Sequence, residues 1–105
     1  MAKERVGRAT PLPDAMQGHW VDADDPSSEL VIAGGEVACF GHSVEYDYKE
    51  VAEIAGALTV SLRVIDEARE DAFERANLTE LVMTPDGEFH AYNSNVATQL
   101  VRARS

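Results

Sequence analysis

The sequence predicts a mainly β protein, a single antiparallel up-and-down meander of about eight short strands that closes into a small barrel. From position 16 onward, short runs alternate between apolar and polar residues, as in strands with one buried face. Turn-forming residues interrupt these runs about every 8–12 positions, a spacing typical of β-sandwiches and barrels. Gly34-Gly35 and Asp86-Gly87 each separate two apolar runs, which indicates tight hairpin turns.

The predicted strands cover residues 17–22, 29–33, 36–40, 42–53, 58–64, 74–84, 89–92 and 96–102. The longest of them has two distinct faces, because side chains alternate along a strand. The face that we expect to point inward carries His42, Val44, Tyr46 and Tyr48. The face that we expect to point to solvent carries Ser43, Glu45, Asp47 and Lys49. The next strand has the clearest alternation, and its inward face carries Leu58, Val60, Leu62 and Val64.

The segment 66–76 allows two interpretations. It is rich in helix-forming residues, and Asp71 and Arg75 form a favourable i, i+4 pair. A helix here would have an apolar face made almost entirely of alanine, which would bury little surface. We therefore expect a long polar hairpin loop, with a helix as the alternative.

The domain organisation is simple. Residues 1–15 contain Pro11 and Pro13 and show no periodicity, so we expect a flexible N-terminal arm before one domain at 16–104. A chain of 105 residues suits a single domain. Its one cysteine, Cys39, excludes an internal disulfide, and no apolar run has the length of a signal peptide or membrane span. We expect a cytoplasmic protein.

The charge is distributed unevenly along the chain. Residues 9–101 contain four basic and eighteen acidic residues, a net charge of −14. Such a surface repels phosphates and anionic lipids, so we expect neither nucleic acid nor membrane partners. It keeps a small protein soluble and also suits a basic protein partner; a homo-oligomer is a further possibility.

The predicted first strand opens with Gly18-His19-Trp20, which resembles the G-x-W motif at the start of lipocalins and other calycin barrels. In that family the tryptophan closes the barrel floor, and an arginine of the last strand packs across its indole ring. The resemblance implies that Trp20 and Arg102, or less favourably Arg104, form such a floor. It also implies an eight-stranded barrel with a lumen, which must be small in a chain of this length.

The candidate ligand-binding residues are those predicted to face this lumen: His42, Tyr46, Tyr48, Leu58, Val60 and Leu62. An apolar cavity with a few polar groups is the usual form of a small-ligand site. Alternatively, these side chains fill the barrel, and the tyrosine hydroxyls are satisfied locally. No motif indicates a catalytic residue, a metal site or a cofactor, since the three histidines lack metal-ligand spacing.

Three functions follow from these alternatives. The protein binds a small apolar or aromatic ligand in its lumen, or it is a structural or interaction module whose barrel is filled. The third function is a small isomerase- or cyclase-like enzyme with Tyr46 or His42 as acid or base, although the sequence gives no positive sign of catalysis.

Overall fold

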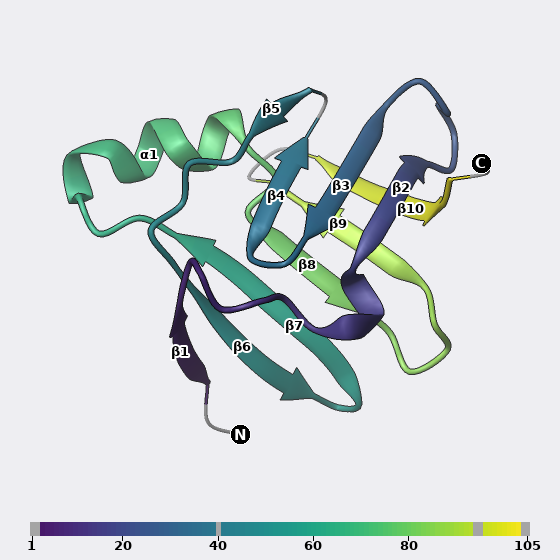
Figure 1. Cartoon of the computed structure of the whole chain (residues 1–105), viewed down its shortest axis with the longest axis horizontal. Coiled ribbons are helices and arrows are strands. Elements are labelled where there is room, and N and C mark those ends of the chain that lie inside the picture. Colours follow the sequence, from purple (N-terminus) through teal and green to yellow (C-terminus); the bar gives the residue numbers. More distant parts are fainter. Residues whose placement is uncertain (1–2, 40, 94–95, 104–105) are drawn as a thin grey trace.

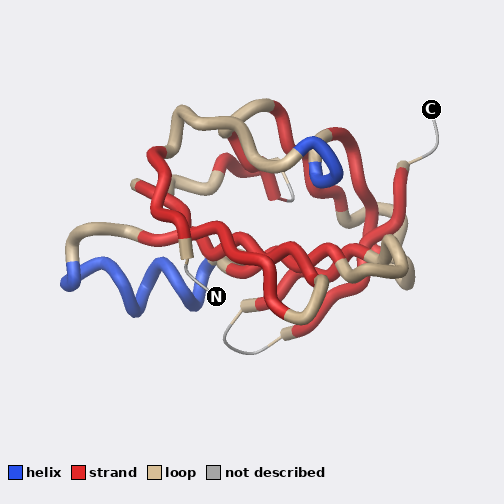
Figure 2. The backbone as a smooth tube through the Cα atoms, turned by 90° about the horizontal axis from the view of Figure 1, so that it is seen from below, coloured by secondary structure: helices blue, strands red, loops and turns tan. Residues whose placement is uncertain are grey.

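The structure, a computed structural model, describes residues 3–39, 41–93 and 96–103. One antiparallel sheet of ten strands curls into a half-barrel, so the predicted fold class is confirmed with a slightly different strand count (Figures 1 and 2). The first strands are β1 (Glu4–Gly7), β2 (Gly18–Asp22), β3 (Glu29–Ala33), β4 (Glu36–Cys39) and β5 (His42–Ser43). The later strands are β6 (Tyr48–Ile54), β7 (Ala57–Arg63), β8 (Glu80–Met83), β9 (Phe89–Tyr92) and β10 (Ala97–Arg102). Phe40, the expected end of the third predicted strand, and Arg104 lie outside the described residues.

The strands follow the order β1-β6-β7-β8-β9-β10-β2-β3-β4-β5 across the sheet. The two halves of the meander meet where β10 pairs with β2, with Arg102 opposite Trp20. The predicted two-residue hairpin at Gly34-Gly35 is present, since Ala33 pairs with Glu36. The meander is interrupted between β5 and β6, which do not pair, so β1 and β5 are the two edges of the sheet.

The segment 66–76 forms a helix, α1 (Glu67–Ala76), and the predicted loop is therefore wrong. Asp66 caps its N-terminus by accepting a hydrogen bond from the Ala68 amide at 2.9 Å. Phe73 is buried against the core, so the helix gains apolar burial that the alanines alone would not supply. Among the described residues, no helix has the length and apolar character needed to cross a membrane.

The N-terminal segment differs from the expected arm, because it forms β1 and then crosses towards the short 3-10 helix η1 (Asp14–Met16). Leu12 is only 1% exposed, and its amide donates to the Gly34 carbonyl at 2.9 Å. A side chain at Gly35 would collide with the Arg8 carbonyl, so the close approach of this crossing segment requires glycine there. We call residues 7–12 the strap.

The predicted strand 42–53 is divided into β5 and β6 by an irregular stretch. The Asp47 amide donates to the Arg63 carbonyl at 2.8 Å, while Tyr48 is the register partner of the same arginine. Two residues therefore oppose one, as in a β-bulge, and the alternation shifts by one position. The predicted orientations are wrong here: Lys49 is fully buried, and Tyr48 shares the outer face of the sheet with Arg63.

Side chains from both halves of the sheet fill the interior of the half-barrel. The Trp20 and Phe89 rings lie 4.5 Å apart between centroids, in a tilted arrangement. Around them is a cluster of fully buried aliphatic side chains, Leu30, Ile32, Val37, Val60, Leu62 and Leu81.

Trp20 and Arg102 close one end of this core. The Arg102 guanidinium lies 4.0 Å from the centre of the Trp20 ring, and the indole Nε1 donates to the Met16 carbonyl at 2.9 Å. Arg102 Nη1 also donates to the Gln17 carbonyl. Gly18 makes room for this arginine, because a Cβ at that position would collide with Arg102 Nη1. Its φ of +118° is a further reason for glycine.

We predict that Gly18→Ala lowers the free energy of unfolding by about 2 kcal/mol, because it strains the backbone and displaces Arg102 from Trp20. Gly34→Ala is the matched control, since Gly34 also has positive φ but has nothing within 4 Å of its Cβ position. It should cost about 1 kcal/mol from backbone strain alone. Urea unfolding followed by Trp20 fluorescence measures both, and equal losses would contradict the prediction.

Candidate functional site

The structure does not bring the six predicted lumen residues together into one cavity. Tyr46, Val60 and Leu62 are buried in the filled core, and Leu58 packs against it. His42 is exposed on β5, and Tyr48 lies on the outer face of the sheet.

Lys49 is the one charged residue buried among the described residues, at 0% exposed. Its Nζ donates to the Gly7 carbonyl at 2.7 Å, to the Arg8 carbonyl at 3.3 Å and to the Tyr46 hydroxyl at 3.2 Å. The Tyr46 hydroxyl in turn donates to the Gly35 carbonyl. An ammonium group has three hydrogens, so these three acceptors satisfy it completely.

Arg8 extends the network to the surface. Its guanidinium pairs with Glu36 of β4 at 2.7 Å and with Glu45 at 3.1 Å. It also lies 5.3 Å from the centre of the Tyr46 ring. The Arg8–Tyr46–Lys49 network thus binds the strap to β4 on one side and β6 on the other, across the interruption in the meander. We interpret it as a structural closure, because its polar groups point at one another.

Burial changes the acid–base behaviour of the groups in this region. It raises the pKa of Tyr46 to about 12, and the negative charge of Glu36 acts in the same direction. Burial lowers the pKa of Lys49, since it disfavours the charged ammonium. It also raises the pKa of the Cys39 thiol to about 11, so little thiolate is present at neutral pH.

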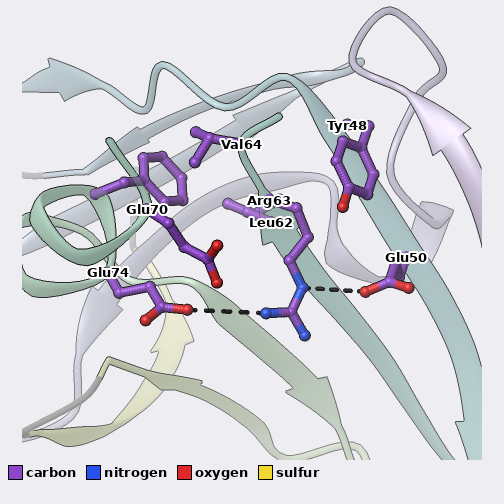
Figure 3. A pocket seen from close by; sticks show the side chains of 8 residues that line it. Tyr48, Glu50, Leu62, Arg63, Val64, Glu70 and Glu74 are labelled. Carbon is purple, nitrogen blue, oxygen red and sulfur yellow. Dashed lines mark hydrogen bonds and ion pairs between the residues drawn. The ribbon is translucent and has the colours of Figure 1, made fainter. Parts of the chain in front are cut away.

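A cleft lies between α1 and the outer face of β6 and β7 (Figure 3). Its volume is about 180 Å³. The lining residues are Tyr48, Glu50, Leu62, Arg63, Val64, Glu70, Phe73 and Glu74. We call this the helix cleft. A second hollow of about 220 Å³ adjoins it at Arg63 and Glu74 and adds another carboxylate and another aromatic ring, Glu80 and Tyr92.

The helix cleft is acidic, with three carboxylates against one guanidinium, a net charge of −2. Arg63 Nε bonds to Glu50 at 3.0 Å, and its Nη1 lies 3.8 Å from Glu74 (Figure 3). The exposed side chain of Glu70 points into the same space and makes no hydrogen bond or ion pair with any described residue (Figure 3). Tyr48 and Phe73 supply aromatic surface, so the cleft suits an organic cation.

The described residues contain no group of three or more His, Cys, Asp or Glu side chains arranged to hold a metal ion. The three glutamates of the cleft are therefore a diffuse negative surface and do not form a coordination sphere. A hydrogen-bonding cation of several atoms matches such a surface better than a compact ion does.

Sequence reasoning missed this cleft for two reasons. The bulge at Asp47 turns Tyr48 and Glu50 to the outer face, and the helix that supplies Glu70 and Glu74 was predicted to be a loop. One signal was present: Glu70 and Glu74 are spaced i, i+4 around Phe73, so a helix would place both acids beside one buried ring.

A third hollow, of about 380 Å³, lies on the outer face of β2, β3 and β10. Its walls are mostly aliphatic, and they include Val21, Pro26 and Val101. His19 and Glu29 stand 3.5 Å apart at its border.

Tyr46 of the Arg8–Tyr46–Lys49 network should make the stability of the protein depend on pH. The pKa of Tyr46 in the folded protein is about 12, above the ordinary value near 10. The neutral hydroxyl therefore contributes its full stabilisation to the fold below pH 10, and this contribution is lost as the pH rises towards 12. We predict that the free-energy difference between the wild type and Tyr46→Phe shrinks by up to about 2 kcal/mol over this interval. Urea titrations at pH 9, 10, 11 and 12 test this, and parallel profiles for the two proteins would contradict it.

Comparisons of the chain with protein-family models, curated proteins and solved structures found no match.

Proposed function

We propose that this protein is a non-catalytic interaction module, a filled half-barrel that binds a basic segment of a partner protein in the helix cleft. One observation carries the proposal: the cleft places an unpaired carboxylate, Glu70, beside two aromatic rings and two further glutamates that share a single arginine. A cationic side chain entering there would pair with Glu70 and reduce the net charge of the cleft from −2 to −1.

The dimensions favour a side chain over a free small molecule. Pockets for drug-sized ligands usually span about 300–1,000 Å³, whereas the helix cleft measures about 180 Å³. That volume accommodates one long side chain. A ligand in the barrel lumen would have to displace packed residues such as Val60 and Leu62, which are at most 1% exposed.

Charge supports the same partner. The whole chain has a net charge of −10, so a basic segment is attracted over distances comparable to the Debye length. Such attraction accelerates association and selects against acidic competitors. Within the cleft, Arg63 already shows that a guanidinium fits between Glu50 and Glu74.

We further propose a distant relationship to calycin barrels and a cytoplasmic location. The stacking of Arg102 on Trp20, with Gly18 making room for it, supports the relationship. The single cysteine, which is buried and unpaired, supports a reducing compartment. The packed interior supports a function outside the lumen, in contrast to the lumen binding that the lipocalin resemblance implies.

The test titrates ¹⁵N-labelled protein with a short peptide that alternates arginine and serine, and with a matched glutamate–serine peptide. We expect the arginine peptide to shift the amide resonances of Tyr48, Arg63, Glu70 and Glu74. Glu70→Gln should weaken its affinity about three- to fivefold, because the substitution removes the unpaired charge without changing shape.

Glu67→Gln is the matched control. Glu67 lies on the same helix and carries the same charge, but it does not line the cleft. The affinity of Glu67→Gln for the arginine peptide should stay close to that of the wild type. Equal weakening by both substitutions, shifts confined to another face, or equally strong binding of the glutamate peptide would each refute the proposal.

A further inference from the structure

The edge strand β1 brings a second guanidinium to the border of the helix cleft. Arg5 Cζ lies 3.8 Å from the centre of the Tyr48 ring. In the register of β1 and β6, Arg5 is opposite Glu50 and Gly7 is opposite Tyr48. Arg5, Tyr48 and Glu50 therefore lie on the same face of the sheet, and the latter two line the cleft.

This contact shows which cation the cleft wall accepts. Arg5 stacks its guanidinium on Tyr48, and Arg63 lies between Glu50 and Glu74 in the same cleft. A planar guanidinium stacks on aromatic rings and bridges carboxylates, whereas an ammonium group is a compact, strongly hydrated charge. The geometry therefore fits arginine more closely than lysine.

The Arg5 side chain is also easy to displace. It is exposed and makes no hydrogen bond or ion pair with any other described residue, so among those residues it is held by the Tyr48 ring alone. The backbone of the segment is held separately, through the Gly7 carbonyl bonded to Lys49 and through the pairing of β1 with β6. Arg5 can leave the ring while β1 and the strap stay in place.

We infer that Arg5 is an internal stand-in for an arginine of the partner: it covers Tyr48 in the free protein and is displaced when the partner's arginine enters the cleft. The inference rests on the proposed function and adds to it the identity of the recognised side chain and an autoinhibitory contact. Arg5 lowers affinity in two ways, because it occupies aromatic surface and places a like charge beside the incoming cation.

The experiment compares Arg5→Ala with Lys3→Ala for binding of the arginine–serine peptide and a lysine–serine peptide, by calorimetry at one ionic strength. Both substitutions remove one positive charge from the same segment, but it is Arg5, not Lys3, that stacks on the Tyr48 ring. We expect Arg5→Ala to bind the arginine peptide about three- to fivefold more tightly than Lys3→Ala does. The affinity for the lysine peptide should increase by a smaller factor on the same substitution.

Arg5→Gln, which keeps a long side chain, should reproduce the gain, and unchanged β1–β6 amide contacts by NMR show that the strand is intact. An Arg5→Ala affinity no higher than that of Lys3→Ala would overturn the inference, and so would an equal gain for both peptides. These outcomes leave the proposed function standing if Glu70→Gln still weakens the wild-type complex. Absence of peptide binding to the wild type and to every variant would overturn both.

Discussion

The hydrogen bond from the Asp47 amide to the Arg63 carbonyl decides which side chains of β6 face the core. Because Tyr48 is also opposite Arg63, the chain gains one residue at this point, and every later side chain of the strand changes face. Lys49 is turned into the interior and Tyr48 onto the outer surface. The attachment of the strap to β6 depends on the first change, and the wall of the helix cleft depends on the second.

A buried lysine is costly to desolvate, and its presence is explained by the acceptors around it. Two of the three, the carbonyls of Gly7 and Arg8, belong to the strap. The strap thus supplies hydrogen-bond acceptors that replace the water lost when Lys49 is buried. In return, Lys49 anchors the strap at the position where β5 and β6 do not pair. This mutual requirement explains how the gap between β5 and β6 in the half-barrel is bridged by side chains and carbonyls in place of a continuous ladder. A buried network with every member satisfied also favours one arrangement over its alternatives.

Because side chains pack the interior, binding sites are to be sought on the outer surface of the molecule. A small β-barrel can be filled by side chains or can hold a ligand. In this ten-stranded half-barrel, large residues such as Trp20, Phe89 and Tyr46 occupy the interior. A fold of this kind is a rigid support, and function then depends on what its surface presents. On this surface α1 stands beside β6 and β7, where a helix and a twisted sheet leave a cleft with acidic walls. At the border of this cleft, Arg5 of β1 lies over the Tyr48 ring.

Local sequence patterns were sufficient to predict the parts of the fold that depend on alternating side chains and on turn residues. The alternation of β7, the glycine hairpin between β3 and β4 and the run of turns predict an antiparallel meander, because side-chain period and turn chemistry are properties of neighbouring residues. Three features were decided only by tertiary contacts. Residues 67–76 form a helix because Phe73 is buried in the core. The N-terminal segment forms a strand because it pairs with the edge of β6. The bulge at Asp47 depends on the hydrogen bond of its amide to Arg63. Each depends on a partner distant in sequence, and the cleft is formed where these long-range contacts meet.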